Sequence, residues 1–163
     1  MWFFIKNTGY ELRGGYFTFK TNYLNPFPLP KLENITDQQI FIEKADLMLS
    51  LNKQLQEKKN KFLNRVKDNL CLTGHVPLTK ISKKLEAFYD YDFKTFVTEL
   101  KKQKVKLSLS QQVEWEEFFI AYKTEINQLQ DEINTTDKEI DKMVYKLYEL
   151  TEDEIEIIEK NIG

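Results

Sequence analysis

A hydrophobic heptad pattern runs through residues 119–150 and limits the possible folds of this chain more than any other feature. Ten positions recur there with alternating spacings of three and four, and they are Phe119, Tyr122, Ile126, Leu129, Ile133, Thr136, Ile140, Met143, Leu147 and Leu150. Only Thr136 is not apolar. A seam sustained over more than four heptads is typical of a coiled coil. At 1.5 Å per residue this helix would be roughly 48 Å long.

A second apolar stripe is long enough to be the antiparallel partner of this seam. Neither glycine nor proline occurs between residue 36 and about residue 70, so a long helix is predicted there. Its stripe is interrupted by Asn52 and Lys59 and consists of Phe41, Ala45, Met48, Leu55, Phe62 and Val66, widened by Leu47, Leu51 and Leu63. Basic residues fill the second half of this helix, at Lys58, Lys59, Lys61, Arg65 and Lys67.

Helix-capping patterns mark where the helices begin. Thr36 with Gln39, and Thr151 with Glu154, have the spacing of a capping box and predict the starts of the first long helix and of a short last one. Shorter helices are predicted over about 80–89 and 92–103. The second of these would be capped by Asp90 or Asp92, and Ser108 or Ser110 would cap the last long helix.

The first 30 residues have a different character. Aromatic runs on both sides of Gly14-Gly15 predict a β-hairpin. Three alternating prolines, Pro26, Pro28 and Pro30, then predict a stiff connector, because proline fixes φ and biases the preceding residue toward extended structure. The predicted fold is therefore mainly α. It is a long antiparallel coiled-coil helical hairpin with shorter helices, plus a small N-terminal β-hairpin remnant, with a boundary between residues 1–30 and 31–163.

The sequence offers little for catalysis or metal binding. Cys71 is the only cysteine and His75 the only histidine, so neither a disulfide nor a zinc site is expected. We find no glycine-rich phosphate loop and no Gly-x-Ser-x-Gly elbow. The stretch Asn25-Pro26-Phe27-Pro28 is similar to the catalytic loop of amino-group DNA methyltransferases, but the short chain before it leaves no room for a cofactor domain. We expect no catalytic residue, no metal, no membrane span and no signal peptide, and hence a cytoplasmic protein.

The net charge of −2 hides a strong asymmetry. Residues 1–110 carry 19 basic and 11 acidic residues, whereas residues 111–163 carry 5 and 15. A basic first part is suited to nucleic acid. Alternatively, two packed helices of opposite charge simply neutralise one another.

Three segments carry a resemblance to a known family. "YFTFKTNYLNPFPLPKL" before a long helix resembles the end of a target-recognition domain in restriction–modification proteins. The tail "EIDKMVYKLYELTEDEIEIIE" resembles the closing motif of the TaqI-like C-terminal specificity domain of type IIG restriction–methylation enzymes, which are related to type I specificity subunits. "KLEAFYDYDFKTFVTELKKQKVKLSLSQQVEWEEFF" is similar to the same regions, so the resemblance covers residues 10–160.

The resemblance implies a non-catalytic scaffold beside a DNA-reading domain. Its partners would be double-stranded DNA and the methyltransferase and nuclease domains or subunits. S-adenosylmethionine and magnesium would be expected only in those catalytic parts, and this chain would be a fragment without a cofactor of its own. Arg13 and Lys20, near the turn that matches the family, are expected to contact phosphate, as are Lys61 and Arg65 on the first long helix. Tyr145 and Tyr148 match the tail motif and are expected to be structural.

Two other interpretations stay open. The chain could be a coiled-coil interaction module that docks a partner without touching DNA, which the acidic last helices favour. It could also be a homo-oligomer that forms through its own helical bundle.

Overall fold

The computed structural model describes residues 11–12, 16–17, 21, 25–26, 30, 35–72, 76–77 and 81–162. The helices are α3 (Ile35–Asn69), α4 (Lys83–Glu86), α5 (Phe93–Lys102), α6 (Leu109–Leu147) and α7 (Glu152–Ile162), with a 3-10 turn, η1 (Phe88–Asp90). Two short antiparallel pairs join β1 (Glu11–Leu12) to β2 (Tyr16–Phe17) and β3 (Cys71–Leu72) to β4 (Val76–Pro77). The mainly α prediction is confirmed.

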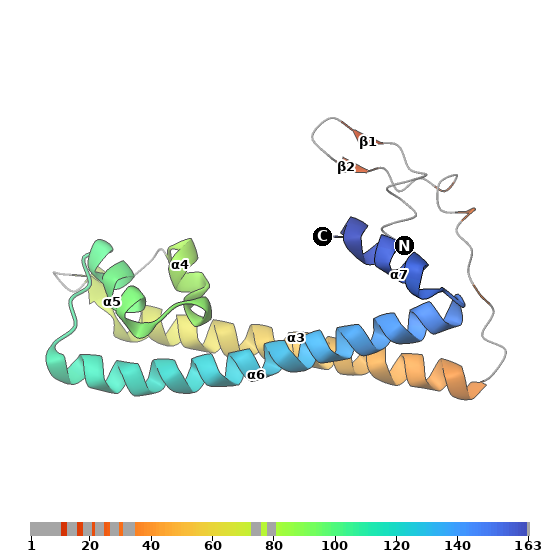
Figure 1. The fold of residues 1–163 in the computed structure, drawn as a ribbon. Helices are drawn as coiled ribbons and strands as arrows, with labels where there is room; N and C mark the ends of the chain where they lie inside the picture. The colour runs from red at the N-terminus through yellow and green to blue at the C-terminus, as the bar shows by residue number, and fades with distance from the viewer. Residues whose placement is uncertain are drawn as a thin grey trace. The chain divides into compact units, whose positions relative to one another are not determined.

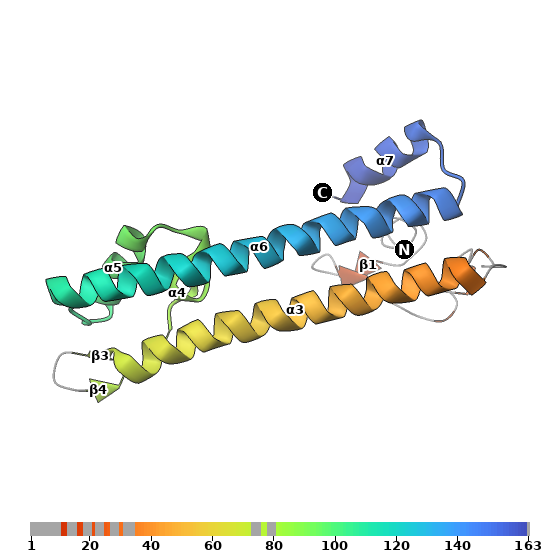
Figure 2. The same cartoon turned by 90° about the horizontal axis from the view of Figure 1, so that it is seen from below.

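The chain forms two compact units. One is Ile42–Lys138, and the other combines Met1–Phe41 with Glu139–Gly163. In the first unit α3 and α6 lie side by side and run antiparallel, which is the predicted helical hairpin (Figures 1 and 2). The short elements α4, η1 and α5 lie beside the end of α3 and the start of α6.

An aromatic cluster centred on Phe62 forms the core of the Ile42–Lys138 unit. The Phe62 ring is fully buried and stacks on Phe88 with 3.8 Å between ring centroids, and on Phe118 at 5.5 Å. Phe119 meets it edge-on at 6.2 Å. Aliphatic side chains from all the helices of this unit complete the core, among them Leu55, Val66, Leu85, Leu100, Val105 and Ile126. Aromatic rings bury a large area per residue, so this cluster contributes strongly to the stability of the unit.

The second half of the predicted stripe on α3 is buried as expected, but part of its first half is exposed. Leu51, Leu55, Phe62 and Val66 are buried, but Ala45 and Leu47 are exposed. These buried residues are spaced by four, seven and four positions, which is close to the 3.6-residue period of a straight helix. Leu51 takes the buried position next to Asn52, which interrupted the predicted stripe. On α6 the predicted seam is right: Phe119, Ile126 and the single polar member, Thr136, are buried.

Side-chain caps define the short helices of this unit. The Ser82 hydroxyl accepts from the backbone N–H of Leu85 at 3.3 Å, and the Asp92 carboxylate accepts from that of Thr95 at 2.8 Å. The expected helix over about 80–89 is wrong in its extent, because it begins only after Ser82 and gives way after four residues to η1. This tighter turn places Phe88 against Phe62.

Ser108, not Ser110, caps α6. Its hydroxyl accepts from the Gln111 N–H at 3.2 Å, and the Gln111 side chain accepts from the Ser108 N–H at 2.9 Å. This reciprocal pair is a capping box.

Helices α5 and α6 end in the same way. Lys104 and Glu149 have φ of 64° and 52°, the left-handed region that glycine usually occupies after a helix. After α5 the Val105 N–H donates to Leu100 O at 3.0 Å, and both of these side chains are buried. After α6 the Leu150 N–H donates to Tyr145 O at 3.0 Å. Both are Schellman motifs closed by a residue other than glycine.

In the second unit the predicted Thr151–Glu154 capping box is confirmed. The Glu154 carboxylate accepts from the Thr151 N–H and hydroxyl, both at 2.8 Å, and the Thr151 hydroxyl accepts from the Glu154 N–H at 3.4 Å. These bonds from Thr151 lower the pKa of Glu154. Tyr145, expected to be structural, is half-buried, and its burial raises the pKa of its phenol.

Several predictions fall at or outside the limits of the described residues. Helix α3 begins at Ile35, one residue before the predicted cap Thr36, which is a common difference at a helix end. The Thr36 side chain lies outside the described part, so the capping box with Gln39 stays a prediction. Pro26 is an exposed turn residue, the Asn25 N–H before it donates to Thr21 O at 2.8 Å, and Pro30 is half-buried. Pro28, His75 and Gly14-Gly15 lie outside the described residues, as does the Cys71 side chain.

The structure describes the strand pairing of the predicted β-hairpin but does not test the predicted domain boundary. Strands β1 and β2 pair with Glu11 opposite Phe17 and Leu12 opposite Tyr16, as a hairpin about Gly14-Gly15 requires. The boundary between residues 30 and 31 stays a prediction. Among the residues that the structure describes, no helix is both long and apolar enough to cross a bilayer.

Candidate nucleic-acid interface

The structure separates the basic residues of α3 into two groups. Lys58 forms an ion pair with Glu125 of α6, and the hydrogen bond to this carboxylate raises the pKa of Lys58. Lys59 donates to the Tyr89 hydroxyl at 2.8 Å and lies 4.2 Å from the centre of the same ring. These two lysines therefore connect α3 to α6 and to η1, and both ammonium groups interact with other side chains of the same chain.

Lys61 and Arg65 form the second group. Both are exposed and lie one helical turn apart, and within the described residues neither forms an ion pair. They line a shallow groove of about 340 Å³ on the surface of α3, together with Glu57, Asn60, Asn64 and Asp68. Glu57 lies 4.0 Å from Lys53, one turn earlier. Spacing of i and i+4 places the Lys61 and Arg65 side chains on one face of the helix.

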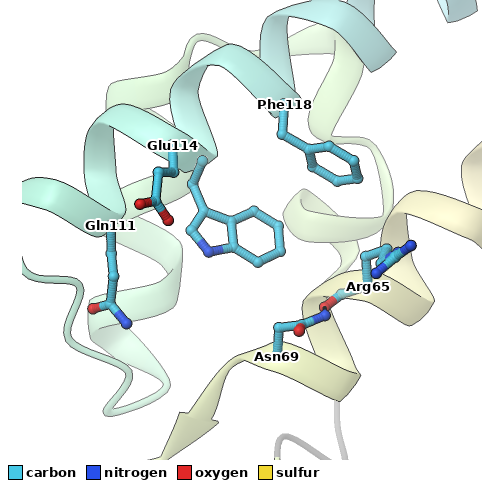
Figure 3. Close-up of a pocket in the computed structure, with 6 residues that line it drawn as sticks. Arg65, Asn69, Gln111, Glu114 and Phe118 are labelled. Carbon is cyan, nitrogen blue, oxygen red and sulfur yellow. Dashed lines mark hydrogen bonds between the residues drawn. The ribbon is translucent and has the colours of Figure 1, made fainter.

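Arg65 also borders a second groove, of about 370 Å³, between α3 and α6 (Figure 3). Arg65 and Asn69 come from α3 on one side, and Gln111, Glu114 and Phe118 come from α6 on the other, with Trp115 completing the wall. The Trp115 and Phe118 rings meet edge-to-face, with centroids 5.5 Å apart.

Polar groups at this second groove are held in place from within the chain. The Asn69 amide donates to Arg65 O at 2.9 Å, and the Gln111 side chain is held by the Ser108 N–H. Sequence reasoning missed this groove. The signal was available in the spacing of Gln111, Glu114, Trp115 and Phe118, which places all four on one face of α6.

This arrangement is equipped for binding. Lys61, Arg65, Asn60 and Asn64 present cationic and amide groups on one helix surface, of the kind that contact phosphate, and the carboxylates of Glu57 and Asp68 lie in the same groove. In the parts of the chain that the structure describes, no group of three or more His, Cys, Asp or Glu side chains could hold a metal ion. The lowered pKa values of Asp92, Glu99 and Glu154 have structural causes. Asp92 is the N-cap of α5, Glu154 accepts from the α7 cap Thr151, and Glu99 accepts from Lys102 at 2.6 Å.

The four predicted DNA-binding residues are only partly located. Lys61 and Arg65 lie together as described. Arg13 and Lys20 are outside the described residues and stay predictions.

Comparison with known proteins identifies a family. The model of a family described as a domain of unknown function, DUF8810, matches residues 34–144. The chain belongs to the DUF8810 family. No curated protein and no solved structure matches it. The DUF8810 match extends from the start of α3 to near the end of α6 and therefore includes Lys61, Arg65 and both grooves.

Proposed function

We propose that this DUF8810 protein is the helical scaffold of a restriction–modification specificity domain. It acts in the cytoplasm, supports sequence-specific recognition of double-stranded DNA and docks against methyltransferase or endonuclease parts, without catalysis of its own. S-adenosylmethionine and magnesium belong to those catalytic parts. The observation that carries this proposal is the pair Lys61 and Arg65, which stay exposed while the neighbouring Lys58 and Lys59 are used within the chain.

The resemblance in sequence supports the proposal independently of that pair. The tail similar to the closing motif of type IIG specificity domains, residues 139–159, forms the last turns of α6 and most of α7. Its Thr-x-x-Glu element is the Thr151–Glu154 capping box. The motif therefore includes residues that determine where a helix begins.

A DNA-binding titration at several salt concentrations tests the proposal. The chain should bind duplex DNA weakly, with an affinity that falls steeply with salt. The double variant K61E/R65E should weaken binding and reduce the slope of log K against log salt by roughly 2, because about 0.9 is expected per phosphate contact.

The matched control is K94E/K106E, which makes the same change in charge at two exposed lysines away from α3. It should leave the salt slope closer to that of the wild type. Equal slopes for the wild type and K61E/R65E would contradict direct phosphate contact by this surface. Methyl transfer to DNA by the purified chain, with S-adenosylmethionine added, would contradict a non-catalytic role.

The second candidate function is a helical interaction module that docks a partner without touching DNA. Exposed aliphatic side chains on α6, at Leu109, Val113 and Ile120, favour it. In this case K61E/R65E would not alter DNA binding by the assembled complex, whereas the leading proposal expects that binding to weaken.

A further inference from the structure

The outer face of the first half of α6 carries an apolar stripe exposed to solvent. Leu109, Val113 and Ile120 are 83%, 61% and 54% exposed. At about 100° per residue the three lie within roughly 40° of one another around the helix axis. The buried Phe119 and Ile126 lie about 110° away on the same helix. The stripe is therefore separate from the face of α6 that packs in the core.

Acidic side chains accompany this stripe. Glu116 falls between Val113 and Ile120 on the same face, and Glu117 lies beside it; both are exposed. Within the described residues neither forms an ion pair. The only cation among residues 109–124 is Lys123, whose ammonium donates to Tyr91 O at 2.5 Å. Within residues 109–124 the carboxylates therefore outnumber the cations, although four lysines precede the stripe at residues 101–106.

We infer that this stripe, Leu109, Val113 and Ile120 with Glu116 and Glu117, docks a basic amphipathic helix of a partner protein. Aliphatic residues at helical spacing form the seam into which a second helix packs. The unpaired glutamates select lysine or arginine beside the apolar residues of that helix and disfavour an acidic one, because like charges across an interface weaken binding. This inference rests on the docking part of the proposed function and not on DNA contact by Lys61 and Arg65.

The test uses the full chain and two synthetic helical peptides. One peptide has leucine at the helical spacing i, i+3, i+4 and i+7 and lysine on the opposite face, and the other has glutamate in place of every lysine. Binding is measured by fluorescence anisotropy of the labelled peptide in the absence of DNA. The lysine peptide should bind and the glutamate peptide should not.

Variants then locate the binding surface. V113Q/I120Q should weaken binding of the lysine peptide about tenfold or more, since two aliphatic side chains lose their burial in the interface. Glutamine is a good helix former, so α6 should remain intact, which circular dichroism checks. E116K/E117K should weaken binding of the lysine peptide and allow the glutamate peptide to bind. The matched control I42Q/L49Q removes two exposed aliphatic side chains of α3 and should change neither affinity.

Three results of the binding measurements would overturn the inference: no binding of the lysine peptide, equal affinity for both peptides, or equal affinity of the wild type and V113Q/I120Q for the lysine peptide. A wild-type dimer in sedimentation that V113Q/I120Q dissociates would also overturn it, since the occupant would then be a second copy of the chain. None of these results affects the salt titration with K61E/R65E, so a failure here is distinct from a failure of DNA binding.

Discussion

Phe62 is the residue on which the packing of the Ile42–Lys138 unit depends most. Its ring is fully buried and contacts rings from three other elements: Phe88 of η1, Phe96 of α5, and Phe118 and Phe119 of α6. A single side chain thus joins α3 to η1, α5 and α6. The sequence shows Phe62 on an apolar stripe, but it does not show which aromatic residues meet there, because those contacts join positions far apart in the chain.

Phe62→Ala should destabilise the protein by about 3–5 kcal/mol, the range for removing a buried phenylalanine. Phe118→Ala is the matched control: this ring also stacks on Phe62 but is only partly buried, so its loss should cost less. Urea unfolding followed by circular dichroism measures both. A loss below about 1 kcal/mol for Phe62→Ala would contradict the central role of this ring.

The carboxyl group of Glu154 should titrate below its ordinary pKa of 4.5, because the Thr151 N–H and hydroxyl both donate to it. A lowered pKa in the folded state means that the stabilisation is fully present above the unfolded value and is lost as pH falls through the folded value. The cap of α7 should therefore weaken only in acid, below about pH 4.5.

NMR titration of the Glu154 side chain checks this. In Thr151→Ala the pKa should rise but remain below 4.5, since the backbone N–H still donates. Thr124→Ala, at an exposed threonine of α6, should leave the pKa of Glu154 where it is in the wild type. An unchanged pKa in Thr151→Ala would show that the hydroxyl contributes nothing.

At the scale of elements, the residues at which helices begin were easier to predict from the sequence than the lengths of the helices. Capping depends on residues three apart in sequence, so Asp92, Ser108 and Thr151 could be named beforehand, the first two as one of two alternatives. The extent of α4 could not be predicted. Its early end depends on the position that Phe88 takes in a core built from α3, α5 and α6.

The choice between Asp90 and Asp92 as the cap of α5 gives a direct test. Asp92→Ala should destabilise the protein by about 1 kcal/mol, the usual cost of losing an N-cap. Asp90→Ala removes the alternative aspartate, which is exposed in η1, and should cost only about 0.5 kcal/mol or less. Thermal unfolding of the two variants compares them, and equal shifts in Tm would argue against capping by Asp92.

For the molecule as a whole, the sequence predicted the mainly α class and the antiparallel pairing of the two long helices. The heptad seam indicated the class, and the second apolar stripe of similar length in the same chain indicated the antiparallel pairing. The distribution of burial along α3 was not predictable: Ala45 and Leu47 belong to the apolar pattern yet are exposed, whereas Leu55, Phe62 and Val66 meet the aromatic cluster. In the candidate site, Lys61 and Arg65 were predicted from the run of basic residues in the second half of α3. The groove between Arg65 and Trp115 depends on the register of α3 against α6, which no local pattern contains.

Hydrogen exchange should reveal this uneven burial. Amides of residues 55–66 should exchange at least roughly ten times more slowly than those of residues 42–49 in the same helix, because opening the former exposes the aromatic core. Mass spectrometry of peptides from α3 measures the difference. Uniform protection along α3 would contradict it and would indicate that the helix opens as a single unit.

The Schellman motifs at Lys104 and Glu149 offer a route to engineering the protein. A side chain in the left-handed region costs about 1 kcal/mol that glycine avoids, so K104G and E149G should each raise the melting temperature. Glycine at exposed positions in the middle of α6, such as Thr124→Gly, should lower it. Neither Lys104 nor Glu149 belongs to the Lys61–Arg65 surface or to the α6 stripe. The K104G/E149G double variant should therefore be more stable than the wild type. Destabilising substitutions such as Phe62→Ala, made in this double variant, should leave enough folded protein for binding assays.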